Sequence, residues 1–141
     1  MVYVSEAVRA FDEAELQGLA LHAAAKNERL GVTGYLHYAH ERRMFFQYLE
    51  GERATVLGLM AEILADDRHV VRNTLEIGEV GPRHFPRWSM RHLAEGELRA
   101  IRLEDVLESV LLTMCEPAFS PGESRPAVLR IVRQLAARDL D

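Results

Sequence analysis

The order of secondary-structure signals along the sequence predicts an α+β fold of the ferredoxin-like class. Short runs rich in β-branched and aromatic residues alternate with two amphipathic segments in the order βαββαββ. Glycine or proline stands at several of the boundaries between these runs, and two more amphipathic segments follow them. We therefore expect a sandwich in which two helices cover one face of a sheet, followed by a C-terminal helical pair.

The N-terminal part of the chain begins with a strand and continues with a long helix. Residues 2–5, "VYVS", predict the strand. Asp12 can cap the N-terminus of the helix, and Glu15, three residues later, completes a capping box. Gly31 is placed to end the helix, and residues 32–37 predict the second strand.

The middle of the chain supplies the remaining core elements. Residues 44–50 predict the third strand, and residues 53–66 predict the second helix, which carries an apolar stripe at helical spacing. Residues 74–80 predict a fourth strand and, beyond the loop "GPRHFP", residues 88–93 predict a fifth. In this topology we expect the first and third strands to be adjacent and parallel in the middle of the sheet.

The C-terminal part reads as two helices joined by a loop rich in proline, glycine and serine. Apolar residues keep helical spacing over residues 103–114 and again over residues 128–135. Pro126 suits the first position of the second of these helices. We expect a core domain over residues 1–95 and a two-helix extension over residues 96–141.

Composition and charge argue against several classes of protein. The net charge of −5 argues against binding nucleic acid through a broad basic surface. No apolar run approaches the roughly 20 residues of a membrane span, and the first residues do not resemble a secretory signal. The single cysteine, Cys115, cannot form an internal disulfide, and the histidines show no metal-binding spacing. We therefore expect a cytoplasmic protein without direct nucleic-acid or membrane contacts and without a metal site.

The third predicted strand is apolar on both of its faces. Because strand side chains alternate, Phe45, Gln47 and Leu49 share one face, while Phe46 and Tyr48 take the other. A sheet with two apolar faces needs cover on both. The first two helices cover one face, and we expect the C-terminal helices to pack on the other or to bury it in a homodimer or larger homo-oligomer.

Gln47 is a polar residue inside this apolar strand, "MFFQYLEG". A buried amide without partners costs roughly 1–3 kcal/mol. Tyr3 can meet Gln47 if the two share a face on neighbouring strands, Asn27 lies near the end of the first helix, and Arg68 and His69 follow the second helix. This set predicts a flat crevice with a phenol at its floor, suited to a planar heterocycle that donates and accepts hydrogen bonds.

Five blocks of the sequence, in their order and spacing, resemble the BLUF domain, a blue-light sensor that uses flavin. They are "VYVS", "AAAKNERLGVTGYLHY", "FFQYLEG", "DDRH" and "RWSM", and the resemblance covers about residues 1–94. The C-terminal helical pair is similar to that of short BLUF proteins, which carry no attached enzyme domain. The sequence departs from the family in the longer turn "YAHERRM" and in Lys26, which precedes Asn27.

The resemblance implies a role for each matching residue. Tyr3 would be the photoactive tyrosine and Gln47 the glutamine that switches its hydrogen bonds. Trp88 and Met90, which strand alternation places on one face of the fifth strand, would be the signalling pair that exchanges places near Gln47. The cofactor-binding residues would be Tyr3, Ser5, Asn27, Gln47, Arg68 and His69.

The function that the resemblance implies is sensing rather than catalysis. Blue light would excite the flavin, an electron and then a proton would pass from Tyr3 through Gln47, and the amide would be left rearranged. The altered hydrogen bond would bias the fifth strand and signal to a separate partner protein. The sequence contains no GxGxxG loop, so we expect the phosphate end of the cofactor to be held loosely and FAD, FMN or riboflavin to fit.

Two other functions stay open from the residues alone. A small ferredoxin-like hydrolase would use an arginine and an asparagine, but it would need a glycine-rich phosphate loop where "SEAVRAFDEA" stands. A cofactor-free interaction module would use the helical tail for assembly. Bound flavin distinguishes the photosensor from both alternatives.

Overall fold

A five-stranded sheet forms the middle layer of the molecule. The computed structural model describes residues 1–79 and 81–138. The strands are β1 (Val2–Ala7), β2 (Thr33–Ala39), β3 (Met44–Glu50), β4 (His69–Leu75) and β5 (Arg91–Leu93). Their order across the sheet is β4-β1-β3-β2-β5.

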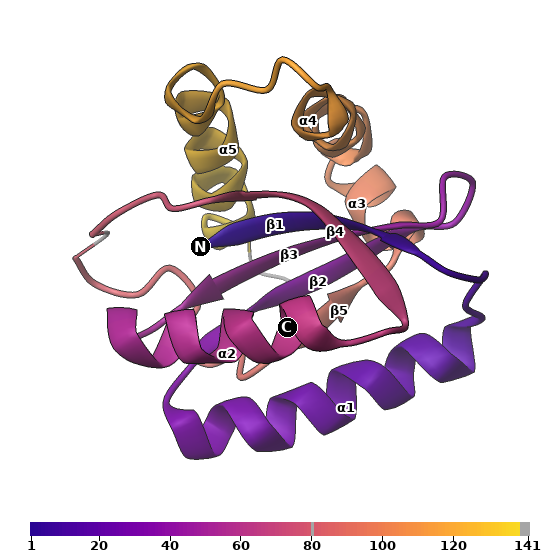
Figure 1. Cartoon of the computed structure of the whole chain (residues 1–141). Helices are drawn as coiled ribbons and strands as arrows, with labels where there is room; N and C mark the ends of the chain where they lie inside the picture. Colours follow the sequence, from indigo (N-terminus) through magenta and orange to yellow (C-terminus); the bar gives the residue numbers. More distant parts are fainter. Residues whose placement is uncertain (80, 139–141) are drawn as a thin grey trace.

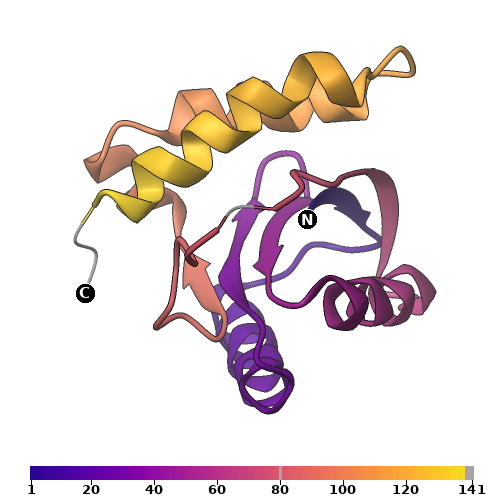
Figure 2. The ribbon, with the colours of Figure 1, turned by 90° about the vertical axis from the view of Figure 1, so that its left-hand side faces the viewer.

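Helices cover both faces of this sheet. The helices are α1 (Glu13–Leu30), α2 (Arg53–Ala65), α3 (Glu95–Ala100), α4 (Glu104–Cys115) and α5 (Pro121–Ala136). The first two lie on one face, and α4 and α5 lie on the other (Figures 1 and 2). The predicted α+β sandwich with a C-terminal helical pair is thus confirmed. Within the described residues, no helix has the length and apolar character needed to cross a lipid bilayer.

The first and third strands are adjacent, as predicted, but the expectation that they are parallel is wrong. β1 pairs with β3 in the antiparallel sense, with Tyr3 opposite Gln47, and β3 is also antiparallel to β2. The reason lies in the connections. The crossover through α1 makes β2 parallel to β1 but leaves one strand position empty between them, and the hairpin after β2 reverses the chain into that position.

Two strands have different limits from those predicted. β4 begins at His69 rather than at residue 74, and the backbone of Gly78 is left-handed (φ 95°), which ends any extended run there. Val80, the predicted end of this strand, lies outside the described residues. β5 begins at Arg91 rather than at residue 88, because a turn and bends occupy residues 86–90.

The C-terminal region also differs in detail from the prediction. The short helix α3 begins where a domain boundary was expected. α5 begins at Pro121, where a missing N–H costs no helical hydrogen bond. Pro126, predicted to be the first residue, therefore lies inside the helix.

Each face of the sheet has its own apolar core. On one side, Phe46 and Tyr48 are buried against side chains of α4 and α5, including Leu107 and Ile131. On the other side, the core under α1 and α2 includes Leu16, with Phe45 and Leu49 from the third strand. The C-terminal helices thus complete the core on the Phe46 and Tyr48 face, while the division into domains 1–95 and 96–141 stays a prediction.

The packing of α4 on the sheet can be tested with two adjacent leucines. Leu111 is 1% exposed and Leu112 is 42% exposed. We expect Leu111→Ala to lower the free energy of unfolding by about 2–5 kcal/mol, because it leaves a cavity in the core. Leu112→Ala should change it by about 0.5 kcal/mol or less. Urea denaturation measures both, and equal losses would contradict the packing of α4 described above.

Candidate functional site

A cavity of about 210 Å³ opens between α1, α2 and the sheet. Its apolar walls are formed by Phe11, Leu19, Ala23, Leu36, Phe45, Leu59 and Ile63. The structure brings five of the predicted site residues to its lining: Tyr3, Asn27, Gln47, Arg68 and His69. The volume is below that of pockets that enclose a drug-sized ligand, so a planar ring would fill it and leave any long substituent at the rim.

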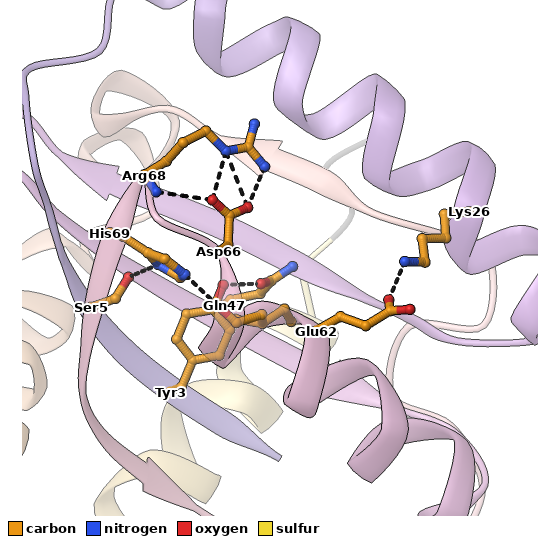
Figure 3. Close-up of polar contacts among 9 residues, drawn as sticks. Tyr3, Ser5, Lys26, Gln47, Glu62, Asp66, Arg68 and His69 are labelled. Atoms are coloured by element: carbon orange, nitrogen blue, oxygen red, sulfur yellow. Dashed lines mark hydrogen bonds and ion pairs between the residues drawn. The ribbon is translucent and has the colours of Figure 1, made fainter.

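Tyr3 and Gln47 form the polar floor of the cavity. They are cross-strand partners on β1 and β3, and the Tyr3 hydroxyl donates a hydrogen bond to Oε1 of Gln47 (Figure 3). Nε2 of Gln47 donates to Sδ of Met90 at 3.3 Å. A thioether is a weak acceptor, so the two ends of the buried amide have partners of unequal strength. The amide can therefore exchange its weaker bond at low cost.

The Tyr3 phenol keeps its proton at neutral pH. Burial raises the pKa of Tyr3 above its usual range, and the nearby negative charge of Asp66 raises it further, although Arg68 opposes this effect. In the ground state Tyr3 is therefore a hydrogen-bond donor to Gln47 rather than a phenolate.

His69 is held in one orientation by two hydrogen bonds. Its Nε2 lies 2.8 Å from the carbonyl oxygen of Ile63, and its Nδ1 lies 2.7 Å from Oγ of Ser5 (Figure 3). Since a carbonyl only accepts, Nε2 carries the proton of the neutral ring and Nδ1 accepts from the serine hydroxyl. Ser5 is fully buried and is not part of the cavity lining, so it supports His69 from behind.

Asn27 connects the cavity to the segment before β5. It is 2% exposed, near the end of α1, and its Nδ2 donates to the carbonyl oxygen of Ser89 at 3.0 Å. Ser89 precedes Met90, the partner of Gln47. Two amides of the cavity thus contact two consecutive residues of one segment, a connection that the sequence did not reveal.

Asp66 is a site residue that the sequence reasoning missed as a functional position, although it begins the quoted block "DDRH". Its carboxylate accepts from Nε of Arg68 at 2.9 and 3.1 Å and from the Arg68 backbone N–H at 3.0 Å. The hydrogen bonds from Arg68 lower the pKa of Asp66 to about 2. This pair places a fixed cation and a fixed anion at the rim beside Tyr3 (Figure 3).

Trp88 and Met90 do not share a face, so that expectation is wrong. Met90 lies in the core under α1 and α2, beside Gln47. Trp88 packs on the core under the C-terminal helices, where it stacks on Phe85 with ring centroids 4.9 Å apart. Strand alternation does not apply to them because both residues precede β5.

A family model identifies the class of protein to which this chain belongs. The family model described as "BLUF: Sensors of blue-light using FAD" matches residues 1–91, and the chain belongs to this family. The match favours the photosensor over the two alternatives that the residues left open.

Similar proteins include photoreceptors and light-regulated enzymes. The structure of BlrB, a BLUF protein in its dark state, is 30% identical, with a TM-score of 0.69 over 96% of this chain and 92% of that chain. Klebsiella pneumoniae BlrP1, in its structure with FMN and cyclic diGMP, is 28% identical, with a TM-score of 0.60 over 87% of this chain and 32% of that one. Photoactivated adenylate cyclase subunit beta of Euglena longa is 29% identical over 112 residues, which are 78% of this chain but only 13% of the cyclase subunit.

Alkaline titration tests the state of the buried phenols. Burial raises the pKa of Tyr3, Tyr35 and Tyr48, three of the four tyrosines. In the unfolded chain they would titrate near pH 10, so the stability they provide is complete below about pH 10 and falls as the pH rises further. As the pH is raised, we expect most of the phenolate absorbance to appear only when the protein unfolds, that is, together with the loss of its circular dichroism signal. Ionisation of all four tyrosines near pH 10 in the folded protein would contradict this.

Proposed function

We propose that the chain detects blue light through Tyr3 and Gln47, with a flavin held between α1 and α2. The observation that carries this proposal is the buried chain of hydrogen bonds from Tyr3 to Gln47 and from Gln47 to Met90. It begins at the floor of the cavity and ends beside β5. A change in the orientation of the Gln47 amide therefore alters a contact at Met90, next to β5.

The residues present fit a flavin. An isoalloxazine ring is planar, with one apolar end and one edge of hydrogen-bonding groups, and the cavity has apolar walls and a polar floor. Asn27, Gln47 and Arg68 are the residues that would bind the polar edge. FAD is the proposed cofactor, supported by the description of the family, and FMN could replace it, as the related BlrP1 structure suggests.

The chemistry of the response follows from the Tyr3–Gln47 contact. A bound flavin supplies blue-light absorption and, once excited, the capacity to accept an electron. A phenol that loses an electron becomes strongly acidic, and Oε1 of Gln47 is the atom placed to receive the proton of Tyr3. Rotation or tautomerisation of the amide then exchanges its donor and acceptor ends, which ends the donation to Met90. An electron and a proton return to Tyr3, so the phenol is restored and only the amide is left changed.

The segment before β5 would carry the signal to a separate protein. Gln47 donates a hydrogen bond to Met90, and Asn27 donates one to the carbonyl oxygen of Ser89. A new orientation of the Gln47 amide would remove the first of these bonds and so change the relative stability of the conformations of this segment. The chain would act as a sensor without an activity of its own, as a homodimer or larger assembly. A cytoplasmic location is in keeping with its single, free cysteine, Cys115.

The roles of Tyr3 and Gln47 can be tested in purified, flavin-loaded protein. We expect blue light to shift the flavin absorption of the wild type to longer wavelength, followed by recovery in darkness. Tyr3→Phe and Gln47→Ala should keep the bound flavin and its colour but lose this shift, because each removes one partner of the essential hydrogen bond. A normal light response in either variant would exclude the assigned role.

The structure also distinguishes Met90 from Trp88. Met90→Leu keeps the volume but removes the sulfur acceptor of Gln47. Loss of one hydrogen bond of about 1 kcal/mol should change the rate of dark recovery by roughly fivefold. Trp88→Phe alters a ring on the opposite side of the sheet and should change the rate by less than about twofold, within the usual small effect of a remote conservative change. Absorbance measures the recovery. A larger change in its rate for Trp88→Phe than for Met90→Leu would contradict the placement of Met90 beside Gln47 and of Trp88 on the other face of the sheet.

A further inference from the structure

Lys26 and Glu62 form an ion pair across the mouth of the cavity. Lys26 projects from α1 and Glu62 from α2, and both line the cavity (Figure 3). Their side chains are 37% and 60% exposed, so the pair lies at the rim rather than in the interior. Lys26 is the only lysine in the sequence. We call this pair the clasp, because it joins the two helices between which a ligand must enter.

The clasp is the weaker of two ion pairs at the rim. Asp66 and Arg68 are neighbours in the chain and share several hydrogen bonds, one of them to the backbone. Lys26 and Glu62 extend from separate helices on long side chains, and exposed pairs of this kind contribute little net stability. Lys26 is therefore the rim cation that a ligand can recruit most easily.

We propose that Lys26 binds the phosphate of a phosphorylated flavin and that Glu62 competes with the phosphate for it. This inference rests on the proposed function, since the flavin ring must occupy the cavity. The cavity has room for the ring, so the phosphate-bearing substituent lies at the rim, where the clasp is. A phosphate carries more negative charge than a carboxylate and offers more acceptor oxygens, so it displaces Glu62 from the ammonium group.

The clasp therefore selects among flavins. FMN and FAD gain the contact with Lys26, whereas riboflavin gains none. Glu62 reduces this gain, because its carboxylate must be displaced and then repels the phosphate at close range. The phosphate end is thus recognised by a single side chain, in contrast to the loose binding that the missing glycine-rich loop led us to expect.

Flavin titrations of the flavin-free protein test the inference. Riboflavin, FMN and FAD are each titrated into the wild type, Lys26→Met, Glu62→Gln and the control Glu28→Gln. Glu28 is exposed on α1 and does not line the cavity, so its variant removes one negative charge away from the rim. Flavin fluorescence gives the dissociation constants.

We expect changes only for the phosphorylated flavins. Lys26→Met should weaken FMN and FAD by about five- to tenfold, and Glu62→Gln should strengthen them by roughly three- to fivefold, as expected for one charged hydrogen bond and one nearby like charge. Riboflavin affinity and the control variant should stay within about twofold of the wild type. Added salt should reduce the preference of the wild type for FMN over riboflavin.

A second measurement needs no substitution. Reductive methylation with isotope-labelled formaldehyde labels the single lysine and the N-terminal amine, so the Lys26 signal is readily assigned by NMR. FMN should shift this signal clearly more than riboflavin does, because both carry the same ring and only FMN carries the phosphate.

Four outcomes would overturn the inference. In the first, Lys26→Met weakens all three flavins equally, which would make the clasp a support of the cavity only. In the second, the Lys26 signal responds to riboflavin as it does to FMN. In the third, the wild type binds no flavin, riboflavin included, and the proposed function fails as well. In the fourth, the wild type binds riboflavin, but Lys26→Met keeps the wild-type preference for FMN and FAD over riboflavin. That result would overturn this inference and leave the proposed function standing.

Discussion

The hydrogen bond from the Tyr3 hydroxyl to the Gln47 amide is the contact on which the site depends. Antiparallel pairing of the two central strands places these residues directly opposite each other, and the apolar sandwich around them excludes water. In such surroundings a hydrogen bond is stronger than in water, and a proton or amide that moves has few alternative partners. The site can therefore have two defined arrangements of the same few groups rather than a continuum.

The segment before β5 lies between the two cores of the molecule. Met90 packs in the core under α1 and α2, while Trp88 packs on the core under the C-terminal helices. The upstream end of this segment is held by Glu50, whose buried carboxylate accepts hydrogen bonds from the backbone N–H groups of His84 and Phe85. Glu50 fixes one end of this segment, and β5 pairs with β2 at the other end, so the segment connects the two faces of the sheet.

Five of the six residues predicted to bind the cofactor line the cavity, and two of them stand out in the sequence because their surroundings do not explain their chemistry. Gln47 stands out in an apolar strand, and Asn27 is a buried amide on an apolar helical face. Asp66 and Glu62 could not be identified in this way, since charged residues at helix ends and on exposed helical faces are common. Asp66 pairs with Arg68, two residues further along the chain, whereas Glu62 meets Lys26 only after α1 and α2 have packed on the sheet.

The sequence by itself determined the order of the elements other than the short helix α3, the two apolar faces and the identity of the polar residues. Alternation and helical spacing are local properties of the chain, so they can be read without the fold. Only the tertiary structure decided the direction of the central strands, which depends on a crossover and a hairpin acting together. It also separated Trp88 from Met90, since a turn and bends just before β5 break the alternation expected there. Contacts between distant segments set these features, and no local pattern in the chain records such contacts.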